Sequence, residues 1–201
     1  RRNKLVMVAQ VDRKQAFLFG RSFKKINIEN GKVTFEVIDP KDMLVHRFVN
    51  PVSLHSARCV IQTGIYRTLT DILENEDFIE ESRRQLRTYY ENREPNLESD
   101  ETYEQATEKA DRMQTLGVTD EFDPVMGETY IELNEVYRFE YDEDLDDNII
   151  YRYVIAIADD QTFKLHKQAL HEILGKTEDD FWFNHFPYTS WATDPERVDF
   201  W

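Results

Sequence analysis

A run from Thr129 to Ile157 alternates apolar and polar residues with a period of two, and this alternation commits the chain to antiparallel strands. The polar segment 142–148 interrupts the run once, as a turn between two strands does, and 162–166 continues it as a third strand. The sequence therefore predicts an antiparallel meander. The apolar faces are expected to hold Ile131, Leu133, Tyr137, Phe139 and Tyr141 in the first strand, and Ile149, Tyr151, Tyr153, Ile155 and Ile157 in the second.

A hairpin is predicted near the start of the chain. The dipeptide Asn30-Gly31 is the strongest short-range signal for a hairpin turn, and it separates 22–28 from 32–38, where apolar and polar residues alternate again. Asp39-Pro40 is expected to end the second strand, because proline cannot donate a ladder hydrogen bond. On either side of the hairpin we expect a short buried run, Ala16-Phe17-Leu18-Phe19 before Gly20, and a further strand at 57–62.

Two helices are predicted after this strand. Thr68 or Thr70 is expected to cap a short helix, because a threonine oxygen can accept from the free N–H groups of the first turn. The segment 79–91 has the pattern of an exposed helix, with Glu80 and Arg84 spaced as an ion pair at i and i+4.

A third helix is predicted after Thr102, which forms a capping box with Gln105, and Gly117 suits the residue that follows its end. The aromatic tail 181–201 fits no period. The predicted fold class is therefore α+β, with antiparallel β-hairpins and a meander flanked by several amphipathic helices.

The formal net charge of −15 is unevenly distributed. Residues 1–70 carry +8, residues 71–147 carry −19 and residues 148–201 carry −4. A strongly acidic middle argues against a domain that reads nucleic-acid sequence, which would need a basic footprint. It predicts either a solvated surface that aids solubility or a wall that DNA passes without sticking. The basic opening predicts contact with phosphate or an acidic partner, or a salt-bridged face.

Several classes of protein are excluded by composition. The 13 Phe, 10 Tyr and 3 Trp are too many for an intrinsically disordered chain. The one cysteine, Cys59, excludes an intramolecular disulfide framework, and its apolar strand predicts an inert buried thiol. No apolar run approaches the roughly 20 residues that a spanning helix needs. Because the chain opens on Arg1 and stops on Trp201, we expect it to be a fragment of something longer.

Candidate sites for chemistry are weak. An EF-hand loop starting at Asp142 would need Gly at its sixth position and Glu at its twelfth, where the chain has Asp147 and Tyr153. The segment Asp39-Pro40-Lys41 has the D-x-K shape of a nuclease strand, but proline breaks it and no second carboxylate strand is evident. The histidines show no metal-ligand spacing. The sequence predicts a protein that is not an enzyme, with no catalytic, cofactor-binding or metal residues. The histidines are His46, His55, His166, His171 and His185.

Several segments carry a family resemblance through their order and spacing. Residues 31–45 contain Ile38-Asp39-Pro40, followed by Ala57-Arg58 at the start of a hydrophobic strand and by Tyr66 and Thr68 before a helix. The strand pair 135–141 and 153–158 comes next, and the chain ends on proline-aromatic passages at 186–188 and 194–201. In this order the segments resemble those of the portal (head-to-tail connector) proteins of tailed bacteriophages, particularly the podovirus-like branch.

The resemblance implies that 1–201 is a wing-like region, a fragment of a portal subunit with a helical acidic insertion at about 79–128, which matches no segment of the family. Portal proteins form a dodecameric ring at one capsid vertex, through which double-stranded DNA is packaged and ejected. A separate terminase holds the ATPase, so no catalytic residue carries over. The expected location is the virion, after assembly in the host cytoplasm.

The partners that the resemblance implies are other portal subunits, the major capsid protein, and terminase and tail or adaptor proteins through regions outside this fragment. Double-stranded DNA would pass without specific contact, and no membrane is expected. One departure is Asn50-Pro51, which stands where that branch often has an aspartate and a proline, so the proline turn is kept and any role of the aspartate is lost.

Two other classes of function stay open: a generic interaction module of another virion or host protein, and a metal-dependent nuclease fragment. The residues that follow Trp201 would discriminate best. A Pro-x-Gly followed by long amphipathic helices would favour the portal protein, and a metal-dependent cleavage assay would reveal the nuclease.

Overall fold

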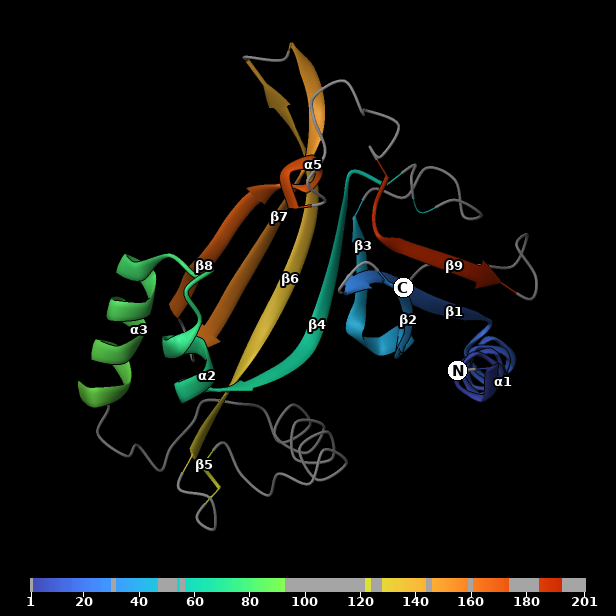
Figure 1. Ribbon diagram of the computed structural model, residues 1–201, viewed down its shortest axis with the longest axis horizontal. Coiled ribbons are helices and arrows are strands. Elements are labelled where there is room, and N and C mark those ends of the chain that lie inside the picture. Colours follow the sequence, from blue (N-terminus) through green and yellow to red (C-terminus); the bar gives the residue numbers. More distant parts are fainter. Residues whose placement is uncertain are drawn as a thin grey trace. The chain divides into compact units, whose positions relative to one another are not determined.

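The computed structural model describes residues 2–29, 32–46, 54, 57–92, 122–123, 128–143, 146–158, 161–173 and 185–192 (Figure 1). The fold is α+β, as predicted, with two antiparallel sheets and flanking helices. The chain divides into two compact units. The first unit comprises Arg1–Thr63, Glu135–Tyr153 and Lys167–Trp201, and the second comprises Gly64–Asn134 and Val154–His166.

A three-stranded sheet of the first unit has the order β2-β1-β9. Strands β1 (Arg21–Glu29) and β2 (Lys32–Ile38) pair antiparallel and end on the pair Glu29–Lys32. That register leaves two residues for the turn, so the predicted hairpin is confirmed, although Asn30 and Gly31 lie outside the described residues. The third strand, β9 (Tyr188–Ala192), lies in the tail where no period was found, because five residues are too few to show one.

Helix α1 (Arg2–Phe19) packs on β1 and β2, and Gly20 follows it with a φ of +76°, the left-handed conformation that suits the residue after a helix. Asp12 faces the sheet and is 8% exposed. Its carboxylate accepts hydrogen bonds from Ser22 Oγ at 2.5 Å and from Lys24 Nζ at 2.9 Å. The helix is therefore fastened to β1 by a partly buried ionic contact.

The prediction that Ala16 to Phe19 form a buried run is wrong. Ala16 is fully buried, but Phe17 is 79% exposed, Leu18 is 66% exposed and Phe19 is also exposed. The physical reason is the helix, in which successive side chains point in directions about 100° apart. Four consecutive residues therefore cannot all face the sheet.

The second sheet has the order β3-β4-β6-β7-β8, and β5 pairs with β6 off this path. Neighbouring positions of β6, β7 and β8 confirm the predicted meander, and the strand predicted at 57–62 begins at Cys59 and is longer than expected. Ahead of it, Asp39 ends β2 and caps the 3₁₀ turn η1 (Pro40–Asp42) by accepting from Lys41 N at 3.0 Å. The strand bounds are β3 (Met43–His46), β4 (Cys59–Thr68), β5 (Phe122–Asp123), β6 (Glu128–Asp142), β7 (Asp147–Ala158) and β8 (Gln161–Ala169).

The predicted apolar face of β7 is wrong over most of the strand. Val154, Ala156 and Ala158 are buried, whereas Ile157 is exposed. Both faces of this strand carry apolar residues, so alternation by itself does not say which face turns inward. The small side chains at 154, 156 and 158 are the ones that the core accommodates.

The second unit places two helices against its strands. Helix α2 (Leu69–Glu74) is capped by Thr68, whose Oγ1 accepts from Asp71 N at 3.1 Å, which decides between the two predicted caps. Helix α3 (Glu80–Asn92) confirms the helix predicted at 79–91, with the Arg84–Glu80 ion pair at 3.0 Å. The core of this unit comprises Ile72, Leu86, Ile131, Leu133, Val154, Ala156, Ala158, Phe163 and Leu165.

The core of the first unit joins residues from both of its sheets and from the short helix α5 (Leu170–Ile173). The helix predicted from Thr102 to Gly117 lies outside the described residues. Among the helices that are described, none has the length and apolar character required to cross a membrane. The first core comprises Phe23, Ile38, Met43, Leu54, Ala57, Val60, Tyr137, Ile150, Leu170, Phe186 and Tyr188.

Candidate functional site

A charged residue, Glu135, lies inside the core of the first unit and is 2% exposed. It belongs to β6, where Ile131, Leu133 and Tyr137 occupy the same face of the strand and are also buried. The sequence prediction for this strand assigned Glu135 to neither face. Its odd-numbered position in the alternation was the available signal, because it put a carboxylate in phase with the apolar residues.

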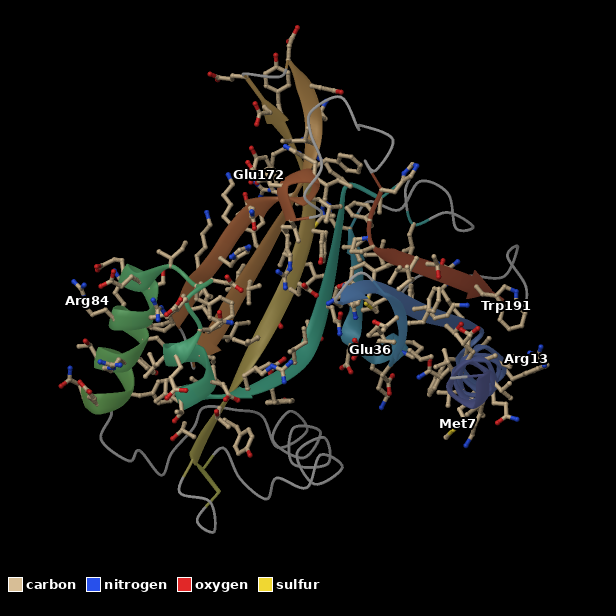
Figure 2. The ribbon with its side chains drawn as sticks, viewed as in Figure 1. Met7, Arg13, Glu36, Arg84, Glu172 and Trp191 are labelled. Atoms are coloured by element: carbon tan, nitrogen blue, oxygen red, sulfur yellow. The ribbon has the colours of Figure 1, made fainter. Side chains whose placement is uncertain are left out.

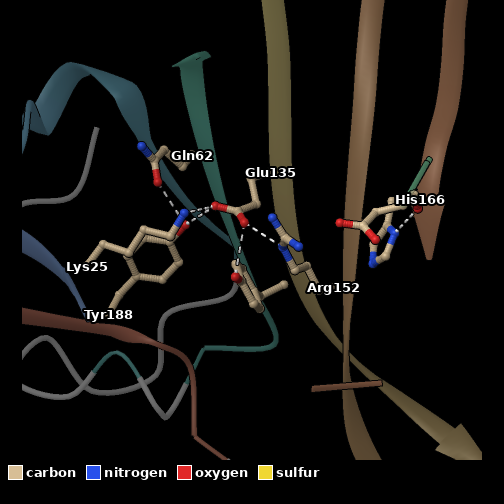
Figure 3. A network of polar contacts seen from close by, with 8 residues as sticks. Lys25, Gln62, Glu135, Arg152, His166 and Tyr188 are labelled. Carbon is tan, nitrogen blue, oxygen red and sulfur yellow. Dashed lines mark hydrogen bonds and ion pairs between the residues drawn. The ribbon is translucent and has the colours of Figure 1, made fainter. Parts of the chain in front are cut away.

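Two cations neutralise the carboxylate of Glu135 (Figure 3). Lys25 of β1 forms an ion pair with Oε2, and Arg152 Nε of β7 lies 2.6 Å from Oε1. The hydroxyl of Tyr137 donates to Oε1 over 3.1 Å. The buried carboxylate therefore has charged partners on both oxygens, as a buried charge requires.

Tyr188 of β9 completes this network, which we call the Glu135 network: Lys25, Gln62, Glu135, Tyr137, Arg152 and Tyr188. The Tyr188 hydroxyl lies 3.0 Å from Gln62 Oε1 and 3.3 Å from Glu135 Oε2. It has one hydrogen and can donate to only one of these oxygens at a time. Its ring meets that of Tyr137 edge to face, with centroids 5.5 Å apart. Strands of both sheets of the first unit thus meet at one carboxylate.

The surroundings of Glu135, Tyr137 and Tyr188 shift the pKa values of these three side chains. Burial raises the pKa of Glu135, but the nearby charges and hydrogen bonds of Lys25 and Arg152 outweigh it, so the pKa lies below its usual value. Burial and the charge of Glu135 raise the pKa values of Tyr137 and Tyr188 well above the ordinary range. These shifts move the pKa values of Glu135, Tyr137 and Tyr188 away from pH 7, so the arrangement suits a structural tie.

A second ionic network lies on the opposite face of β6, at Glu140. Its carboxylate contacts Arg138 Nη2 at 2.5 Å and Lys167 Nζ at 3.1 Å, and the Tyr153 hydroxyl also donates to it. Lys167 lies 4.4 Å from the ring centroid of Tyr151. Tyr151 donates to Asp142 over 2.7 Å, and this bond raises the pKa of Tyr151 to about 12. This face of β6 is polar and aromatic, and the carboxylate of Glu140 forms ion pairs with two cations.

The residues that the sequence singled out do not converge on one site. Asp39 is exposed and serves as the cap of η1. The predicted hairpin turn after Asp142 is present between β6 and β7, where Tyr141 donates its hydroxyl to Asp146. Within the described ranges, no three His, Cys, Asp or Glu side chains are grouped so that they could hold a metal ion.

Cys59 and the histidines are also dispersed. Cys59 is buried, as predicted, and burial raises the pKa of its thiol. His46 and His185 are exposed, and His166 Nδ1 lies 3.0 Å from the carbonyl of Asp77. His55 lies outside the described residues.

No protein-family model matches this chain, and no curated protein does so either.

Proposed function

We propose that this chain is the wing-like region of a portal subunit, a structural protein of a tailed-phage virion that surrounds the path of DNA at one capsid vertex. The observation that carries the proposal is a set of large apolar side chains exposed on three elements of the first unit, which we call the exposed surface. Large apolar side chains of this kind mark surfaces that another protein covers. They lie on α1, β2 and β9: Leu5, Val6, Met7, Val11, Phe17, Leu18, Phe19, Val33, Phe35 and Trp191.

The exposed surface belongs to elements that are otherwise well anchored. Helix α1 is fastened to β1 through Asp12, and Figure 2 shows Met7 and Arg13 projecting away from that helix. Trp191 lies near the end of β9, directly across from Ser22 of β1. Residues that are exposed on a rigid element, and not on a loop, suit a permanent contact within an assembly.

The buried chemistry of the first unit supports a structural role in the same way. The Glu135 network joins strands of both sheets, and its pKa shifts hold it in one charge state at neutral pH. The net charge of −19 in residues 71–147 further suits a protein that DNA passes, because acidic surface repels phosphate.

The same exposed surface would suit an interaction module of another assembly, so the test has to locate the protein in the particle. Gold-coupled antibodies against this chain are applied to tailed-phage particles whose genome encodes the chain. Label at a single vertex of each head is expected, with pre-immune antibodies as the control. Native mass spectrometry of the complex released from those heads should then give twelve copies, as in the family it resembles.

Label distributed over the whole head would overturn the portal proposal and favour a general capsid component. Label absent from particles but present on a host complex would assign the chain to a host interaction module. Metal-dependent cleavage of DNA by the purified chain, lost in Asp39→Asn, would instead favour the nuclease alternative.

A further inference from the structure

An open cleft of about 660 Å³ lies in the first unit, over β3, β4 and β6. Its ionisable lining residues include His46, Arg58, Arg138 and Glu140. Backbone hydrogen bonds fix Arg58, which directly precedes β4, against the neighbouring strands: Arg58 N donates to His46 O of β3 over 3.2 Å, and Phe139 N of β6 donates to Arg58 O over 3.2 Å. The cationic side chains are thus displayed from a sheet and not from a mobile loop.

The charge balance in the cleft is positive. Glu140 is the one carboxylate among the lining residues, and it already contacts both Arg138 and Lys167. Within the described part of the chain, the guanidinium of Arg58 makes no hydrogen bond or ion pair, and it is exposed to solvent. One arginine in the cleft is therefore free to bind an anion, in a protein whose net charge is −15.

We propose that this cleft binds a phosphate group, with Arg58 as its principal ligand and Arg138 beside it. A guanidinium presents paired N–H groups whose spacing matches two phosphate oxygens, which is why arginine binds phosphate so often. His46 at the margin offers a further ring N–H. Glu140 already forms ion pairs with Arg138 and Lys167, so its carboxylate repels an incoming anion less than an unpaired carboxylate would.

The phosphate could come from a small phosphate compound or from the backbone of duplex DNA. Acidic residues elsewhere in the protein repel phosphate and weaken either interaction. At physiological salt this repulsion is largely screened beyond about 8 Å, so only acidic residues near the cleft matter. The proposal does not require the portal function, although DNA passing a portal would supply backbone phosphates.

The test compares two variants that each lose one exposed arginine. Arg58→Gln removes the proposed ligand, and Arg87→Gln removes an exposed arginine of α3 in the second unit. Inorganic phosphate is titrated into the intact chain and followed by phosphorus NMR. We expect Arg58→Gln to weaken binding about tenfold or more, the size of one lost charge-assisted hydrogen bond, and Arg87→Gln to leave it unchanged. Arg58→Lys, which keeps the charge without the fork, should fall between.

A labelled DNA duplex distinguishes the source of the phosphate. Its binding is measured between about 50 mM and 200 mM salt. If backbone phosphate is the ligand, Arg58→Gln should reduce the slope of log affinity against log salt by about one, and Arg87→Gln should leave it unchanged. Binding of inorganic phosphate without binding of the duplex would identify a small phosphate compound as the ligand.

Two outcomes would overturn the proposal: no binding of inorganic phosphate by the parent chain, or equal weakening by Arg58→Gln and Arg87→Gln. The second would mean that only net charge matters. Far-ultraviolet circular dichroism and urea unfolding verify that both variants fold. Vertex labelling of particles does not depend on these titrations, so failure of the cleft and failure of the portal proposal are separately visible.

Discussion

Arg152 Nε lies 2.6 Å from Glu135 Oε1, which joins β7 to β6 by an ion pair inside the first unit. Lys25 of β1 neutralises the other carboxylate oxygen. Removal of one partner from a buried charge cluster leaves the others without compensation, which costs far more than loss of a surface pair. The stability of the first unit should therefore depend strongly on this carboxylate.

Glu135→Gln should lower the free energy of unfolding by about 3 kcal/mol, because Lys25 and Arg152 would stay partly buried without a counter-charge. The matched control is Glu140→Gln on the opposite face of β6, where the carboxylate is 16% exposed and its cations Arg138 and Lys167 reach solvent, so a smaller loss of about 1 kcal/mol is expected. Urea unfolding of the three proteins measures both. Equal losses in the two variants would contradict the burial assigned to Glu135.

The pH dependence of stability should change with the same substitution. In the folded protein burial raises the pKa of Glu135, but Lys25 and Arg152 bring it below its usual value. The carboxylate therefore stabilises the fold above the unfolded pKa, near 4.3, and this contribution is lost as the pH falls through the folded value. Urea midpoints from pH 3 to pH 7 should show the parent and Glu135→Gln converging below about pH 4.3. A difference that stays constant over this range would show that the charge is not involved.

Neighbouring positions at the end of α1 should respond in opposite ways. Phe17→Ser should change the free energy of unfolding by about 0.5 kcal/mol or less, because Phe17 is exposed. Ala16→Leu should cost about 1–3 kcal/mol, because Ala16 is fully buried against the sheet and a larger side chain overpacks it. Thermal unfolding of both variants measures this contrast. A larger loss of stability for Phe17→Ser than for Ala16→Leu would instead support the buried run that the sequence predicted.

Cys59 should react slowly in the native chain. It is buried, and burial raises the pKa of its thiol, so little of the reactive thiolate is present near neutral pH. A chromogenic disulfide reagent should modify one thiol per chain rapidly in urea and much more slowly without it. Equal rates in the two conditions would show that Cys59 is accessible in the folded protein.

Thr68→Ala should lower stability by about 1 kcal/mol, because its side chain caps α2 by accepting from Asp71 N. Thr70→Ala removes the second threonine that the sequence offered as a cap and should have a smaller effect. Urea unfolding compares the two variants. A larger loss of stability for Thr70→Ala than for Thr68→Ala would show that Thr70, and not Thr68, caps the helix.

Local elements were predictable because their signals depend on neighbours in the chain. Asn30-Gly31 sets the hairpin register, and the Glu80–Arg84 spacing indicates α3. Each is a preference of a few consecutive residues for one backbone conformation. The end of β2 at Asp39-Pro40 belongs to the same class, because proline acts on the backbone wherever it stands.

The candidate sites were less predictable, because they join residues far apart in the chain. Glu135 meets Lys25 across 110 positions of sequence and Tyr188 across 53. The alternation of β6 indicated that position 135 shares a face with apolar residues, but not that cations from β1 and β7 would neutralise it. Arg58 and Arg138 come together only where β4 and β6 are neighbours in the sheet.

By itself, the sequence determined the class of fold, the hairpins and meander, the two described helices that follow β4 and the uneven charge. The tertiary structure alone decided that Val154 and Ala156 face the core while Ile157 does not, and that Phe17 is exposed while Ala16 is buried. The physical reason is that periodicity specifies how often a chain turns a side chain inward. Which residues take that direction depends on the volume and charge of the neighbours that the fold brings against them.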